Sequence, residues 1–136
     1  MAGIIGYGVY IPRYRLEQKE AAIPWGSWAG GEKAVCGADE DIVTMAAEAT
    51  DNAMKHAGVN PAQIGAIYIG TASSPYIEQH VAPILAETLG LRPETTMMDY
   101  SGSLNALANA LLGCLDAIAA KRITCGLVIG AENRAT

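Results

Sequence analysis

Two short stretches of the chain are apolar along nearly their whole length, and they constrain the fold most. They are residues 64–72 (IGAIYIGTA) and 123–131 (ITCGLVIGA). Strands with apolar side chains on both faces are typical of a parallel sheet that helices cover on both sides. Residues 95–100 (TTMMDY) and residues 3–11 (GIIGYGVYI), which Pro12 ends, are predicted to be two further strands of this sheet.

Three helices are predicted between the strands, over residues 41–56, 77–89 and 104–122. The first has apolar side chains at helical spacing, and the last carries cations at its C-terminal end. Pro83 implies that the second helix is kinked or begins later than residue 77. The order β-α-β-α-β-α-β predicts an α/β fold with a mostly parallel sheet and right-handed crossovers.

Residues 13–38 are predicted to be a long loop with one short helical turn. Loops of this length in compact domains are usually functional or mobile. Trp25 and Trp28 lie in it, and large aromatic side chains are common both around ligands and at protein interfaces. The loop is therefore expected to be a flap over a ligand, or else a hydrophobic cover or interface segment.

Composition excludes several classes of function. Of the 136 residues, 51% are hydrophobic and 17% charged, which suits a packed core, and the net charge of −5 offers no basic surface for nucleic acid. Cys36, Cys114 and Cys125 match no zinc-binding spacing, so no metal is expected, and free thiols favour a reducing cytoplasm. The N-terminus does not resemble a signal peptide, and no apolar run reaches the ~18 residues of a membrane span.

Several local motifs favour structural roles. The glycines of residues 3–8 do not have the GxGxxG spacing of dinucleotide sites, so close backbone packing is the better account. His56 is expected at the C-terminal end of a helix, and His80 lacks a partner motif, so a structural role is favoured. The acids at 39–41 suit the first turn of a helix better than a cation site.

A strand turns sharply into a helix within residues 97–112 (MMDYSGSLNALANALL), a geometry that often exposes a nucleophile. Ser101 and Ser103 are the candidates there, but no base is close in sequence, and Ser103 is predicted to be the N-cap of the helix. Ser73 and Ser74, after the strand at 64–72, could bind a ligand or cap the next helix, and capping is favoured.

Five segments together resemble the N-terminal part of the thiolase superfamily, and most closely its archaeal and bacterial hydroxymethylglutaryl-CoA synthase type. In order they are GIIGYGVYIPRYR, EKAV with ADEDIVTMAAEA, IGAIYIGTASSPY, the MMDY strand with its helix, and GLVIGAEN. The resemblance implies one of two similar halves of a five-layered αβαβα fold, which condenses acyl-CoA thioesters. It also implies a Cys at the N-terminus of the buried helix that takes the acyl group, a Glu after the second strand that acts as acid/base, and a His from the second half.

At the catalytic positions this chain does not have the residues that the resemblance implies. Asp99 matches the family's strand aspartate, and Leu104 stands five residues later, where the Cys is expected. A register shift of one residue would offer Ser103 instead. Ala72 stands at the Glu position, and the second half with its His is absent from a chain that ends at Thr136. Leucine cannot take an acyl group, and alanine cannot transfer a proton.

The chain, residues 1–136, is therefore expected to be a partial thiolase-like N-terminal domain and a non-catalytic subunit of an acyl-CoA condensing or thiolytic complex. The alternatives are an acyltransferase with altered chemistry, using Ser103 or groups of a partner, and a non-enzymatic interaction module. Partners would be thiolase-like chains that supply the second half or the catalytic Cys; an OB-fold/zinc-ribbon protein is a further candidate that the resemblance suggests. No cofactor is expected, and a CoA thioester is implied as substrate by the resemblance alone.

Overall fold

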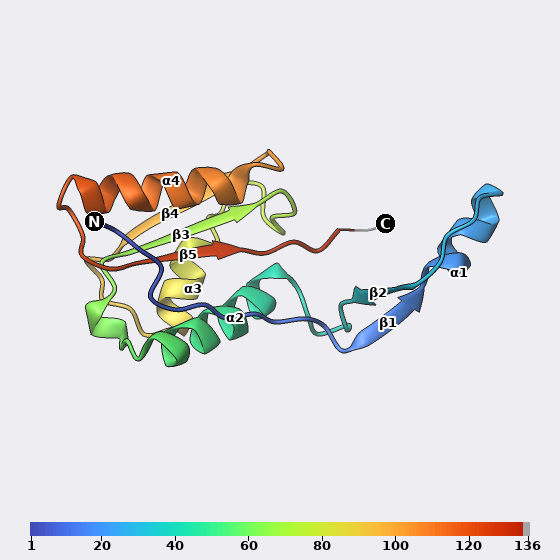
Figure 1. The fold of residues 1–136 in the computed structure, drawn as a ribbon, viewed down its shortest axis with the longest axis horizontal. Helices are drawn as coiled ribbons and strands as arrows, with labels where there is room; N and C mark the ends of the chain where they lie inside the picture. Colours follow the sequence, from blue (N-terminus) through green and yellow to red (C-terminus); the bar gives the residue numbers. More distant parts are fainter. Residues whose placement is uncertain (135–136) are drawn as a thin grey trace.

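A three-layered α/β arrangement forms the body of the protein (Figure 1), in a computed structural model that describes residues 1–134. The central strand β3 (Ala66–Thr71) pairs in parallel with β4 (Thr96–Ser101) on one side and β5 (Gly126–Gly130) on the other. This confirms the predicted parallel sheet, which has three strands where four were expected.

Helices cover both faces of the sheet. The helix α4 (Ala106–Ala119) lies over one face, and α2 (Ile42–Ala57) and α3 (Ala82–Thr88) lie over the other (Figure 1). All six residues of β3 are buried, and the alternation of its side chains divides the core into two clusters. Ile67 and Ile69 pack toward α2 and α3, whereas Ala66 and Tyr68 pack toward α4.

The three predicted helices exist, with shifted ends. α2 begins at the Asp41 cap, whose carboxylate accepts from the N–H groups of Val43 and Thr44, each at 2.9 Å, and Gly58 ends it at φ 66°. α3 begins at Ala82, which confirms the later start that Pro83 implied, because proline suits the first turn of a helix. No helix of the described residues is long and apolar enough to cross a membrane.

The prediction of a strand at residues 3–11 is wrong. These residues are extended but do not belong to the sheet, and they run along α2 beside β5 (Figure 1). The predicted close backbone packing is confirmed, since a Cβ on Gly8 would lie 2.2 Å from the carbonyl oxygen of Ala49.

The prediction of a loop over residues 13–38 was incomplete. β1 (Tyr14–Glu17) and β2 (Glu32–Val35) pair antiparallel, and α1 (Gln18–Ala22) and the 3₁₀ helix η1 (Ile23–Trp25) follow β1. This hairpin arm projects from the body of the protein (Figure 1). A second 3₁₀ turn, η2 (Pro61–Gln63), precedes β3.

Candidate functional site

The carboxyl ends of β3, β4 and β5 meet beneath the start of α4, and in parallel α/β sheets ligands bind at this edge. The helix lies unusually close to the sheet there. A Cβ on Gly70 would lie 2.4 Å from the backbone nitrogen of Leu107, and one on Gly130 would lie 2.7 Å from a Cδ of Leu107. Glycine at position 70 is therefore required for the first turn of α4 to sit over the strand ends, because the atoms that a Cβ would meet there belong to the helix backbone.

Asp99 of β4 holds the start of α3. Its carboxylate accepts hydrogen bonds from the backbone N–H groups of Val81, at 2.6 Å, and Ala82, at 2.9 Å. These are two of the amides that a helix N-terminus leaves unpaired, and a carboxylate is the favoured acceptor there. The Nδ1 atom of His80, whose side chain is 59% exposed, lies 4.0 Å from the same carboxylate, and the structural role expected for this histidine stays a prediction.

Glu132, just beyond β5, supplies a second carboxylate at this edge. Its Oε1 accepts from the backbone N–H of Ala72 at 2.7 Å, and its Oε2 accepts from the hydroxyl of Ser73 at 2.8 Å. The oxygen of Ser73 accepts in turn from the backbone N–H of Asn133 at 2.9 Å. The hydrogen bonds of Glu132 thus connect the loop after β3 to the segment that follows β5.

Sequence reasoning missed Glu132. Its segment, GLVIGAEN, contributed to the family resemblance, but no role was assigned to the carboxylate. The available signal was its position directly after a buried parallel strand, where polar side chains face the same edge as those after β3.

The capping predictions for the serines are wrong. Ser73 bonds to Glu132, and Ser74 donates to the carbonyl of Tyr76 at 3.0 Å, while α3 begins eight residues after Ser74. The N-cap of α4 is Asn105, and the oxygen of Ser103 accepts from the N–H of Asn105 at 3.1 Å. No hydrogen bond joins Ser103 to a base among the described residues, and its role as a nucleophile stays a prediction.

Leu104 directly precedes the N-cap of α4, and 71% of its surface is exposed. The apolar face of α4 continues this exposure along Leu107, Leu111, Leu112 and Leu115. The three helices and the sheet of the described residues therefore leave this face of α4 uncovered. Leu104 can form a wall of a site but cannot take part in acyl or proton transfer.

The pKa values of two thiols and one phenol are raised. Burial raises the pKa of the Cys114 thiol, and the neighbouring Cys125 raises it further. Burial also raises the pKa of Cys125 and, as the largest cause, that of Tyr68. A nucleophilic cysteine needs a lowered pKa, so neither Cys114 nor Cys125 is suited to act as a nucleophile.

The remaining candidates lie apart from this edge. His56 is exposed at the C-terminal end of α2, as predicted, and the acids at 39–41 include the Asp41 cap. No group of three potential ligands that could hold a metal ion occurs within residues 1–134. Trp25 and Trp28 are 85% and 89% exposed on the hairpin arm, so they do not cover the core of this chain.

No family model matches the chain. Individual proteins do match. The chain is 38% identical to the hydroxymethylglutaryl-CoA synthase of Methanothermobacter thermautotrophicus, over 98% of its own length and 41% of that protein. It is 41% identical to the synthase of Methanopyrus kandleri, over 96% of its own length and 40% of that protein. The chain thus spans about two fifths of the length of these curated relatives.

Solved structures agree with the sequence comparison. The priming β-ketosynthase of the R1128 polyketide pathway superposes with a TM-score of 0.84 at 25% identity, over 96% of this chain and 41% of that one. The chain resembles the N-terminal part of thiolase-superfamily proteins in sequence and in fold. The 3-oxoacyl-[acyl-carrier-protein] synthase III of Aquifex aeolicus gives a TM-score of 0.82 over 96% of this chain and 44% of its own. In this superfamily the chain is similar to the N-terminal part of the hydroxymethylglutaryl-CoA synthases.

Proposed function

We propose that this chain is a non-catalytic half of an acyl-CoA condensing or thiolytic protein of the hydroxymethylglutaryl-CoA synthase type. The proposal rests on which residues stand at the edge of the sheet where the parallel strands end. Leu104 lies before α4, where the resemblance expects a thiol, and Ala72 lies after β3, where it expects a carboxylic acid. The fold that would hold these groups is retained, whereas the groups themselves are replaced by alkyl side chains.

The chemistry of acyl transfer requires both groups. A nucleophile must attack the thioester carbonyl, and a positioned acid or base must move a proton in the condensing step. Glu132 brings a carboxylate near Ala72, but both of its oxygens already accept hydrogen bonds from the β3 loop. In this proposal the chain shapes a wall of the acyl-CoA channel, and the reacting groups come from thiolase-like polypeptide elsewhere in the assembly.

The exposed leucine face of α4 supports a role inside an assembly. Contiguous apolar surface of this kind usually marks a protein interface. The thiolase-like polypeptide that completes the fold is the partner proposed for this face. An OB-fold/zinc-ribbon protein remains a further candidate partner from the resemblance.

The test is to express the tagged chain in its native host, purify what associates with it, and assay condensation of acyl-CoA by release of the CoA thiol. The complex is expected to turn over, and the purified chain alone is not. A Ser103→Ala complex should retain the wild-type rate within about twofold. Turnover by the chain alone, or its loss in Ser103→Ala, would favour the altered-chemistry enzyme instead.

A further inference from the structure

His56 lies in the last turn of α2 and contacts the extended segment at residues 3–11. Its Nδ1 atom accepts a hydrogen bond from the backbone N–H of Tyr7 at 3.2 Å. The two rings also pack together, with centroids 4.5 Å apart and planes inclined by 54°. An imidazole nitrogen accepts a hydrogen bond only while it carries no proton, so this contact requires a neutral ring with its proton on Nε2.

Close packing against α2 brings the segment to this histidine. A Cβ on Gly6 would lie 2.5 Å from that of Ala57. A Cβ on Gly8 would lie 2.3 Å from the backbone nitrogen of Ala53. The two glycines flank Tyr7 in the sequence, so the absence of a side chain on both sides of it lets its amide approach the imidazole.

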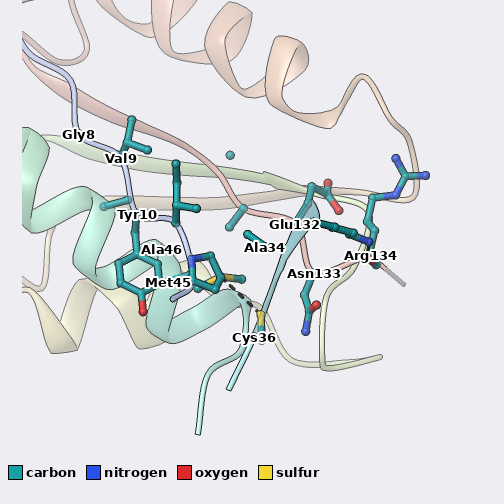
Figure 2. Close-up of a pocket in the computed structure, with 16 residues that line it drawn as sticks. Gly8, Val9, Tyr10, Ala34, Cys36, Met45, Ala46, Glu132, Asn133 and Arg134 are labelled. Carbon is teal, nitrogen blue, oxygen red and sulfur yellow. Dashed lines mark hydrogen bonds between the residues drawn. The ribbon is translucent and has the colours of Figure 1, made fainter. Parts of the chain in front are cut away.

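A second anchor holds the segment three residues further along. The hydroxyl of Tyr10 donates to the carboxylate of Glu40, whose other oxygen accepts from the N–H of Gly37 at 2.7 Å. Tyr10 also packs against the core cluster that contains Met45 and Ala46, and Figure 2 shows the segment passing these residues of α2. Carboxyl groups ordinarily take up a proton at lower pH than imidazole does, so the two anchors respond to acid in different ranges.

The charged groups around His56 are few. On α2 the neighbouring charge is the ammonium group of Lys55, which is bound to the carboxylate of Asp51 at 2.5 Å. Residues 2–9 carry no charged side chain, and Tyr7 is their one titratable side chain; the amino group of Met1 precedes them. Residues 58–64, which include η2, carry no titratable side chain. The charge of the imidazole ring itself therefore dominates any change at this contact between neutral and mildly acidic pH.

Protonation of His56 changes which partners suit it. A protonated Nδ1 is a donor, so it would face the N–H of Tyr7 donor to donor, and that contact is lost. The end of α2 offers an alternative, because a helix C-terminus leaves carbonyl groups unpaired and favours a cation. The neutral ring thus suits the segment, and the charged ring suits the helix end.

We propose that His56 is a pH-sensitive latch on the N-terminal segment. Neutral His56 holds the N–H of Tyr7, and protonated His56 releases it, so that residues 3–7 loosen while Tyr10 stays anchored. Histidine is the side chain that ordinarily changes charge between about pH 5 and about pH 8, so the latch operates in that range. The inference is independent of the proposed function, because it involves no residue at the edge where the parallel strands end.

The test is amide hydrogen exchange on the wild-type chain at about pH 8 and about pH 5.5, expressed as protection relative to the unstructured rate at each pH. The protection of the Tyr7 amide is expected to fall at least about threefold at the lower pH, as the loss of one exposed hydrogen bond implies. The protection of residues 10 and 11 should change by less than that. Equal protection of Tyr7 at the two pH values would overturn the proposal.

A matched pair of variants assigns the change to the imidazole. His56→Asn keeps a side-chain oxygen that can accept from Tyr7 but does not titrate, whereas His56→Ala removes the acceptor. Neither variant should show the pH-dependent fall at Tyr7, and His56→Asn should protect this amide more than His56→Ala at about pH 5.5. A fall in His56→Ala as large as in the wild-type chain would overturn the latch, because it would come from loosening that does not involve the histidine.

Discussion

Glu132 Oε1 accepts a hydrogen bond from the backbone N–H of Ala72 at 2.7 Å, across 60 positions of the sequence. Removing the carboxylate frees both this amide and the hydroxyl of Ser73. We expect Glu132→Ala to lower the free energy of unfolding by about 1 kcal/mol and to speed amide exchange in residues 72–76. Urea unfolding and exchange mass spectrometry measure the two effects.

Ser74→Ala is the control for this prediction, because among residues 1–134 the hydroxyl of Ser74 bonds only within its own loop, to Tyr76. Its effect on amide exchange at Ala72 should be negligible. Equal exchange in Glu132→Ala and the wild-type protein would show that the carboxylate does not hold the loop.

Asp99 should contribute more to stability than Glu132. Asp99→Ala leaves the N–H groups of Val81 and Ala82 without their acceptor at the start of α3. We expect a loss of about 1–3 kcal/mol in the free energy of unfolding, measured by urea titration. Asp99→Asn keeps one oxygen acceptor but loses the charge that favours a helix N-terminus, so its loss should be intermediate. An unchanged unfolding midpoint in Asp99→Ala would contradict the capping role.

The elements that the sequence predicted correctly are those whose signals are local. α2 has helical periodicity, an acidic cap and a terminal glycine within one stretch, and β3 is apolar on both faces. The errors arise where the local structure depends on a residue that is distant in the sequence. Residues 3–11 have strand-like composition, but composition does not supply the neighbouring strand that pairing needs. Ser73 could not be assigned because its partner, Glu132, lies 59 positions away.

The sequence predicted which residues stand at the candidate site better than it predicted the hydrogen bonds that they make. The resemblance placed Leu104 and Ala72, and the structure puts them beside α4 and β3, at the edge where the strands end. The capping of α3 by Asp99 could not be predicted, because the acceptor comes from the neighbouring strand and not from the residues before the helix.

Stability should fall in alkaline solution. The pKa values of Cys114, Cys125 and Tyr68 are raised in the folded protein, from ordinary values of 9.0 for cysteine and 10.0 for tyrosine. Above these values the unfolded chain loses protons that the folded chain still holds, so the free energy of unfolding decreases as pH rises. The contribution of the three groups is fully present below pH 9 and is lost as pH rises through their folded-state values.

Urea midpoints at about pH 7 and about pH 10 measure this dependence. Cys114→Ala removes one of the titrating groups, so its midpoint should change less between the two conditions than that of the wild-type protein. A midpoint that rises with pH in the wild-type protein would contradict the assigned direction of these shifts.

The exposed face of α4 should make the isolated chain self-associate. Leu104 and Leu112 are 71% and 58% exposed, and buried apolar surface is the main driving force for association. Leu104→Gln combined with Leu112→Gln is expected to shift the isolated chain toward monomer in sedimentation experiments. The control is Ala108→Gln, which introduces the same polar side chain at an exposed position of the same helix. A buried position would not serve, because glutamine there would unfold the protein. A wild-type chain that sediments as a monomer would contradict this prediction.

A thiol at position 104 should be reactive. Leu104→Cys places a cysteine just before the N-terminus of α4, where the helix dipole lowers a thiol pKa, whereas burial raises the pKa of Cys114 and Cys125. In a Cys36→Ala background, iodoacetamide at about pH 7 should label residue 104 at least about tenfold faster than either native thiol. Labelling of Cys114 at the same rate would contradict the geometry described for the strand edge.

The central claim is that this chain holds the fold of a condensing enzyme without its nucleophile. Intact mass spectrometry after incubation of the wild-type protein with acetyl-CoA measures it most directly. Under the proposed function no covalent acetyl group should appear on the wild-type chain, because Leu104 stands where the resemblance expects the thiol that would take it. A mass increase of one acetyl group, mapped by peptide sequencing to Ser103, would contradict the account.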